Sequence, residues 1–256
     1  MAEGSPARRP RTRFGIAGTL LAVNLAAPSR PEGQPGASRQ NVTERIHGRL
    51  RDEILRARLQ PGQTVLEHEL ATRFGVSKTP VREALRLLVQ DGWVMVLPRK
   101  GYLIRPLGLD DVREVFHLRE LLEPEFAAEA AWRARGQSDA LLHRAVDALR
   151  AADTDVDQAL ASAAAFHIRT AELAGNIRGA KIVATLVDEV TRLHYLIPSL
   201  EAHIESSEEL EAHEQIAAAI EAGDQRGASR AMRDHLRATA RILVDVFGMP
   251  RRQQRA

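Results

Sequence analysis

Residues 70–92, LATRFGVSKTPVREALRLLVQDG, decide the fold of the front part of the chain. Their apolar residues recur every three to four positions on either side of Gly75, which predicts two helices, Glu67–Phe74 and Lys78–Gln90. Ser77 takes the N-cap position of the second helix, where its hydroxyl can accept a backbone hydrogen bond. Two helices joined by a tight glycine turn are typical of a helix-turn-helix.

The flanking residues extend this pattern to a winged helix. Apolar residues at helical spacing over residues 42–54 predict an earlier helix, with Asn41 and Glu44 spaced as a capping box. On the other side, Trp93–Leu97 and Tyr102–Ile104 are predicted to form two strands joined by a basic tip. This hairpin is the expected wing.

The chain after residue 106 shows helical spacing throughout and no alternation typical of strands. The predicted fold class is therefore mainly α: an N-terminal winged helix-turn-helix with a small β-hairpin wing, then an all-α bundle of six or seven helices. We expect domains over residues 41–106 and 107–250, after a disordered extension over residues 1–40. The predicted bundle helices are Asp110–Ala134, Ser138–Ala151, Asp155–Leu173, Asn176–Ile197, Ser206–Glu221 and Asp224–Phe247.

The composition excludes several classes of protein. The chain has no cysteine, so it has no disulfide, no thiolate zinc site and no cysteine nucleophile, which fits a reducing compartment. No stretch reaches the roughly 18 apolar residues that a membrane helix needs, so no membrane segment is expected. Residues 41–106 hold 12 basic and 7 acidic residues, whereas residues 107–256 hold 18 and 25. This asymmetry predicts that only the front part meets a polyanion.

Residues 1–40 are rich in proline, glycine, alanine, serine and arginine, a composition that does not build a core. The arginine cluster at residues 8–13, followed by an apolar stretch, also resembles a weak export signal. Two other interpretations stay open: a solvated tail that touches DNA non-specifically, or a start codon assigned too early.

Basic and hydroxyl side chains gather at the two places where a winged helix touches DNA. The start of its third helix lies in the major groove, and its wing reaches phosphates or the minor groove. Arg82 can bind a guanine through two hydrogen bonds, and Lys78 and Thr79 can reach bases or phosphates. Any one of these residues could be a solvated surface side chain. The basic charge, the glycine turn and the wing, taken together, indicate DNA binding.

These residues resemble the GntR superfamily of bacterial transcription regulators. The similarity rests on Leu70-Ala71, Phe74–Leu85, Leu88, Asp91-Gly92 and the tip Arg99–Gly101. There are two departures: His68 stands where the family usually has arginine, which predicts a weaker, pH-sensitive contact, and Leu66 takes an N-cap position without a capping side chain. The resemblance implies that double-stranded operator DNA is contacted by His68, Ser77, Lys78, Thr79, Arg82, Lys100 and Gly101.

Residues 110–247 resemble FCD, the helical effector domain of the FadR branch of that superfamily. In that branch the domain binds small carboxylic acids, often beside a metal. The resemblance therefore implies a small organic acid as effector. It rests on Leu118–Pro124, Phe166-His167, Ala174–Asn176, His213, Gly223-Asp224 and His235, in that order.

Three histidines are the candidate metal ligands. His167, His213 and His235 lie on three different predicted helices, so a bundle can bring their imidazoles to one divalent ion. Without a thiolate, such a set suits zinc, nickel, manganese or iron. Metal-binding relatives usually carry an aspartate four residues before the first histidine, but Ala163 stands here. The alternatives are that water or the effector's carboxylate is the fourth ligand, that the site binds metal weakly, or that it binds no metal.

Arg119 is the expected anchor for the effector, because a guanidinium matches a carboxylate through two hydrogen bonds. The alternative is an intrahelical ion pair with Glu123, four residues further on. Each histidine of the candidate site also has an alternative, that of an ordinary polar side chain in the core.

The sequence thus predicts a cytoplasmic, homodimeric transcription regulator, with repression relieved by a ligand as the default. Two recognition helices would read a pseudo-palindromic operator, and the effector would change the geometry of the two DNA-binding heads. No enzymatic activity and no membrane partner are expected. The alternatives are a metal-dependent hydrolase that uses the three histidines and a non-specific DNA-binding protein without an effector.

Overall fold

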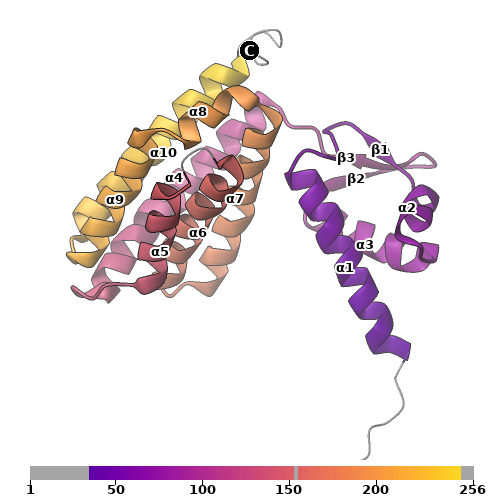
Figure 1. The fold of residues 1–256 in the computed structure, drawn as a ribbon, viewed down its shortest axis with the longest axis horizontal. Coiled ribbons are helices and arrows are strands. Elements are labelled where there is room, and N and C mark those ends of the chain that lie inside the picture. Colours follow the sequence, from indigo (N-terminus) through magenta and orange to yellow (C-terminus); the bar gives the residue numbers. More distant parts are fainter. Residues whose placement is uncertain (1–34, 153–154, 249–256) are drawn as a thin grey trace, which may run out of the picture.

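The computed structural model describes residues 35–152 and 155–248. These residues form two parts that lie side by side, a small winged helix and a larger helical bundle (Figure 1). The elements of the winged helix are α1 (Pro35–Leu55), β1 (Thr64–Val65), α2 (Glu67–Phe74), α3 (Lys78–Gln90), β2 (Val94–Leu97) and β3 (Gly101–Ile104). The bundle contains α4 (Leu109–Ala134), α5 (Ala140–Arg150), α6 (Val156–Leu173), α7 (Ile177–Leu196), the 3₁₀ turn η1 (Pro198–Leu200), α8 (Glu201–Ile204), α9 (Ser207–Glu221) and α10 (Gln225–Gly248).

The core of the winged helix lies between α1 and α3. On α1, Ile46, Leu50 and Ile54 follow one another at every turn and are fully buried. Val81 and Leu85 on α3 belong to the same core cluster, because they too lie four residues apart on one helix face. The opposite face of α3 therefore stays in solvent, as a helix that reads DNA requires.

The ends of α2 and α3 follow the sequence signals. Gly75 ends α2 in the left-handed conformation, with φ 66°, which glycine adopts without strain. Leu66 is the N-cap of α2 and makes no capping hydrogen bond, as predicted. Ser77 lies at the N-cap of α3, but its hydroxyl makes no capping bond either.

A three-stranded antiparallel sheet forms the wing. Its strand order is β1-β3-β2, and Tyr102 in the middle strand pairs with Val65 on one side and Val96 on the other. The predicted hairpin corresponds to β2 and β3. The edge strand β1 was not predicted, since two residues carry no pattern of their own.

The bundle is built around α4, which packs along α10 over much of its length and also contacts α6, α7 and α9. Ala127, Ala130 and Ala131 are fully buried on α4 and let these helices approach closely. Phe166 from α6 and Met232 from α10 belong to the same core cluster. The bundle therefore has an apolar core of its own, as a separate domain requires.

The two parts touch through α1 and α7. Trp93, at the start of β2, is buried, and the guanidinium carbons of Arg51 and Arg192 lie 5.8 and 5.9 Å from the centre of its ring. Arg192 on α7 also donates a hydrogen bond of 3.0 Å to the carbonyl oxygen of Arg105, just after the wing. Arg51 pairs with Asp188 on α7. The bundle therefore contacts both the wing and α1.

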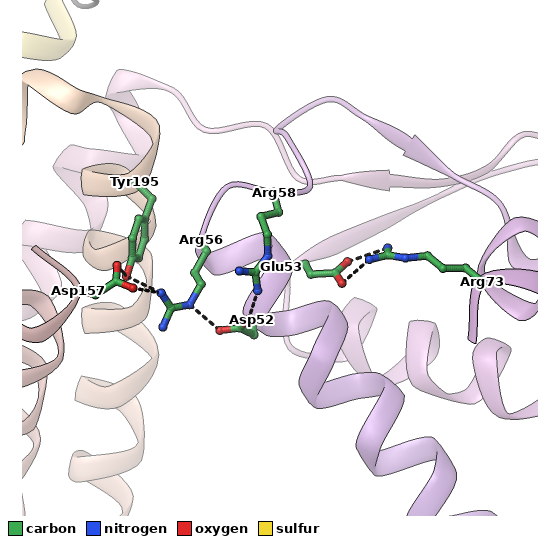
Figure 2. Close-up of polar contacts among 7 residues, drawn as sticks. All are labelled: Asp52, Glu53, Arg56, Arg58, Arg73, Asp157 and Tyr195. Carbon is green, nitrogen blue, oxygen red and sulfur yellow. Dashed lines mark hydrogen bonds and ion pairs between the residues drawn. The ribbon is translucent and has the colours of Figure 1, made fainter. Parts of the chain in front are cut away.

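A second polar contact joins the end of α1 to α6 and α7 (Figure 2). Arg56 pairs with Asp157 at the start of α6 and lies 3.3 Å from the hydroxyl of Tyr195, which itself donates a 2.7 Å hydrogen bond to Asp157. On its other side the guanidinium donates to Asp52. These contacts fix the orientation of α1 on the bundle.

The structure differs from the sequence prediction at the N-terminal side. Helix α1 begins at Pro35, so Asn41 lies inside the helix and does not cap it. Of the predicted disordered extension, residues 35–40 are helical, and residues 1–34 lie outside the described residues. Among the described helices, none is both long and apolar enough to cross a membrane.

Candidate DNA interface and buried histidine site

The N-terminal half of α3 presents the predicted DNA-contacting side chains to solvent. Lys78, Thr79 and Arg82 are exposed, while Val81 and Leu85 on the other face are buried in the core. The wing tip, with Arg99 and Lys100, is also exposed. The exposed members of the predicted set are His68, Ser77, Lys78, Thr79, Arg82 and Lys100.

Arg82 is held by a carboxylate that the sequence analysis did not single out. Its Nε and Nη2 atoms donate to the two carboxylate oxygens of Glu67, at 2.9 and 2.8 Å. The hydroxyl of Tyr102 on β3 donates to the same carboxylate at 3.1 Å. The hydrogen bond from Arg82 lowers the pKa of Glu67. Glu67 thus ties α2, α3 and the wing together and orients the guanidinium.

Gly101 has a structural reason to be glycine. Its φ is 95°, and a Cβ atom at this position would lie 2.6 Å from the carbonyl oxygen of Val65 and 2.6 Å from the side chain of Leu66. Any larger residue would push β1 away from β3. The close approach of β1 explains the glycine without any contact to DNA, and its predicted contact stays a prediction.

The three candidate metal ligands meet inside the bundle. His167 comes from α6, His213 from α9 and His235 from α10, and all three are at most 6 % exposed. Each offers a ring nitrogen, and these three nitrogens lie within 4.8 Å of one another. The Nε2 atoms of His167 and His235 are 3.3 Å apart.

Polar groups lie behind two of the rings, next to the Nδ1 atoms of His213 and His167. His213 Nδ1 donates to the backbone oxygen of Glu209 at 2.7 Å, because a carbonyl can only accept, so Nε2 of neutral His213 keeps its lone pair. That Nε2 atom is buried without a hydrogen-bond partner among the described residues. His167 Nδ1 lies 2.6 Å from a carboxylate oxygen of Glu123. Carboxylates and carbonyls behind the rings are the usual partners of metal-bound histidines.

Burial keeps these rings neutral. It lowers the pKa of His213 to about 3, with the neighbouring His167 as the next cause, and it also lowers the pKa of His167 and His235. Only the neutral ring has a lone pair to offer a metal. The donor set therefore fits a divalent ion that accepts imidazole ligands.

Arg119 makes the predicted intrahelical pair and also lines the cavity. Its side chain is 3 % exposed, and Nε donates to Glu123 at 2.5 Å. Although burial alone would raise the pKa of Glu123, Arg119 and His167 lower it to about 2. The cavity of about 30 Å³ is also lined by His167, His235 and Glu209. Arg119 can therefore pair with Glu123 and also face the cavity where an acid would bind.

The sequence analysis passed over three polar side chains at this cavity, Glu209, His194 and His203. Glu209 is buried beside the histidines, and burial raises the pKa of its carboxyl to about 8. His194 Nδ1 donates to a backbone oxygen at 3.0 Å, as His213 does, and its Nε2 has no partner among the described residues. The spacing Glu209-x-x-x-His213 was the available signal, because such pairs share one helix face.

Comparison with known proteins places both parts of the chain. Residues 42–104 match the family model "Bacterial regulatory proteins, gntR family", and residues 114–238 match the "FCD domain". The chain is 32% identical over 198 residues to an uncharacterized HTH-type transcriptional regulator in an unstable DNA locus of Streptomyces ambofaciens, an alignment that covers 75% of this chain and 81% of that protein. The chain belongs to the GntR family. It is a DNA-binding transcription regulator of the FadR type, with an FCD domain.

Two further similarities agree with this assignment. The HTH-type transcriptional repressor RspR of Escherichia coli K12 is 33% identical over 92 residues, which are 36% of this GntR-family chain and 40% of RspR. The solved structure of E. coli McbR/YncC superimposes with a TM-score of 0.69 at 22% identity, covering 81% of this chain and 99% of that one. At this identity, the superposition shows the fold alone. Membership of a family of DNA-binding regulators agrees with the exposed basic groups on α3 and at the wing tip.

Proposed function

We propose that this GntR-family regulator is a homodimeric, cytoplasmic repressor that leaves its operator when a small carboxylic acid binds in the FCD cavity beside a divalent metal. The observation that carries the proposal is the lining of one buried cavity, which Arg119 shares with His167 and His235. At about 30 Å³ the cavity must widen to admit an acid, so ligand binding has to move the helices around it. A bound cation supplies a second positive charge for a carboxylate. Arg119 supplies a fixed guanidinium, and the buried walls exclude water, which strengthens both attractions.

Two copies of α3 would read the two halves of a pseudo-palindromic operator, because a two-fold protein matches a two-fold site. Arg82, held by Glu67, is the base-reading side chain of each half-site. Lys78 and Lys100 act on phosphates and give the sequence-independent part of the affinity. Operator preference and general DNA affinity therefore rest on different side chains.

Helix α7 provides a route from the cavity to the DNA-binding head. Val190, Thr191 and His194 line the cavity. The residues next to them on α7 carry the contacts to the winged helix: Asp188 binds Arg51, and Arg192 lies over Trp93. A shift of α7 on ligand binding would move both sets of contacts together, because a helix moves as a rigid body.

The experiment that tests this function measures binding to operator and to random DNA at one salt concentration, with a panel of small mono-, di- and tricarboxylic acids and with zinc, manganese or nickel. At least one acid is expected to weaken operator binding roughly 5- to 150-fold, the usual range of allosteric coupling. The His167→Ala variant should bind the operator like wild type and lose this response. Equal loss of DNA affinity in His167→Ala and Arg82→Ala would contradict the division of labour.

The contacts between the two parts should carry the response. In the double variant Asp157→Asn/Asp188→Asn, the acid that releases wild type is expected to release the operator several-fold less, because Arg56 and Arg51 lose their carboxylate partners. Operator affinity without the acid should change little, since ion pairs that stay in contact with solvent, as both of these do, contribute about 1 kcal/mol or less each. The matched control is Asp147→Asn, which removes an exposed partner of Arg150 within α5. An unchanged response in the double variant would exclude this route.

A further inference from the structure

We propose that Glu209 supplies the carboxylate of the histidine site that Ala163 does not. This inference rests on the proposed metal site. Ala163 lies one helical turn before His167 on α6, and Glu209 lies one turn before His213 on α9. Both line the same cavity. Glu209 and Ala163 therefore occupy equivalent positions, each one turn before a candidate ligand, on two different helices.

The charge of the cavity wall gives the first reason. A divalent cation bound by three neutral imidazoles keeps its full charge in a dry site, where it needs a nearby anion. Glu123 is already paired with Arg119, so this pair is close to neutral as a whole. Glu209 is the only acidic side chain among the residues that line the cavity. It is the anion left to balance a cation.

The position of the carboxylate defines its role. Its oxygens lie 3.7 Å from Nδ1 of His213 and 3.8 Å from Nδ1 of His235, behind the rings rather than beside their Nε2 atoms. A third histidine, His203, lies 3.5 Å away. Glu209 is thus a positioning residue: it favours the form of His235 that carries its proton on Nδ1 and presents a lone pair at Nε2. The carboxylate of Glu123 likewise lies behind the ring of His167, close to its Nδ1 atom.

The burial of Glu209 gives an independent reason. Its side chain is 6 % exposed, and among the described residues no lysine or arginine forms an ion pair with it, although Arg119 attracts it from across the cavity. A buried carboxylate without a permanent cation costs free energy, so such a residue needs a compensating partner. A metal held by the three histidines provides that partner. Glutamine would have the same shape and volume without the charge.

The test is a zinc titration of the full-length, tag-free protein by competition with a chromophoric chelator. Glu209→Gln is expected to bind one zinc per chain about 10- to 100-fold more weakly than wild type, the usual effect of removing a residue behind a metal ligand. Glu211→Gln, an exposed change on the same helix, should leave the affinity unchanged. Adding Ala163→Asp should raise the zinc affinity of Glu209→Gln by a larger factor than it raises that of wild type, because wild type already holds a carboxylate at the site, whereas a merely structural role of Glu209 predicts equal gains.

The outcomes separate this inference from the metal site itself. Wild type that takes up no zinc would overturn the proposed metal site and the role of Glu209 with it. Wild-type zinc affinity in a folded Glu209→Gln variant would overturn the role of Glu209 and leave the metal site standing. Equal gains in zinc affinity from Ala163→Asp in wild type and in Glu209→Gln would contradict the role of Glu209 as the carboxylate of the site. Operator binding of each variant confirms that it is folded.

Discussion

Replacing Arg82 with alanine is expected to lower the ratio of operator to random-DNA affinity about 10- to 100-fold per half-site. A bidentate arginine–guanine contact is worth roughly 1–3 kcal/mol of discrimination. Glu67 accepts one N–H from Nε and one from Nη2 of Arg82, so the remaining N–H groups of Nη1 and Nη2 can donate to a guanine. The measurement is competition between operator and random DNA at fixed salt.

Binding of Arg82→Ala to random DNA should fall much less, because the phosphate contacts of Lys78 and Lys100 remain. The matched control is Arg113→Ala, which removes an exposed arginine of α4 that pairs only with a neighbour on its own helix. This variant should keep the wild-type ratio. An equal loss of affinity for both DNAs in Arg82→Ala would show that Arg82 binds phosphate rather than a base.

Replacing His213 should remove the metal. Wild-type protein, purified without a tag, is expected to carry about one divalent metal ion per chain. The His213→Ala variant should carry close to none, because the affinity of the two remaining imidazoles is too low to keep the ion bound during purification. Elemental analysis measures this directly. His213→Gln keeps more of the buried volume and serves as a second variant if the alanine destabilises the core.

The matched control is His143→Ala, since His143 lies on α5 and pairs with Glu221 near the surface. It should keep the metal content of wild type. Absence of metal from both wild type and variant would mean a metal-free pocket. In that case Arg119 is the main anchor for an acid, and the three histidines are polar lining.

The parts of the fold that depend on neighbours in the chain could be predicted from the sequence. The bounds predicted for α2 and α3 match the structure, because glycine, N-cap and apolar spacing act within a few residues. Strand β1 was missed, since Thr64–Val65 is a strand only through its pairing with β3. The start of α1 was placed six residues late, because Asn41 and Glu44 imitate a cap inside a longer helix.

The candidate site, too, has a part that could be predicted from the sequence and a part that could not. Three histidines on separate helices could be grouped from the sequence through the resemblance to FCD, and the structure does bring them together. Their partners could not be derived in this way. Glu67 meets Arg82 only through the angle between α2 and α3, and Glu209 meets His235 only through the packing of α9 on α10.

Trp93 gives this protein a natural optical reporter. The chain has two tryptophans, and Trp132 is 45 % exposed whereas Trp93 is 5 % exposed. Because guanidinium groups from α1 and from α7 lie over the Trp93 ring, its fluorescence senses whether the DNA-binding head and the bundle are docked. With Trp132 replaced by phenylalanine, the remaining emission would follow the movement of one domain against the other in real time, in solution and without a label.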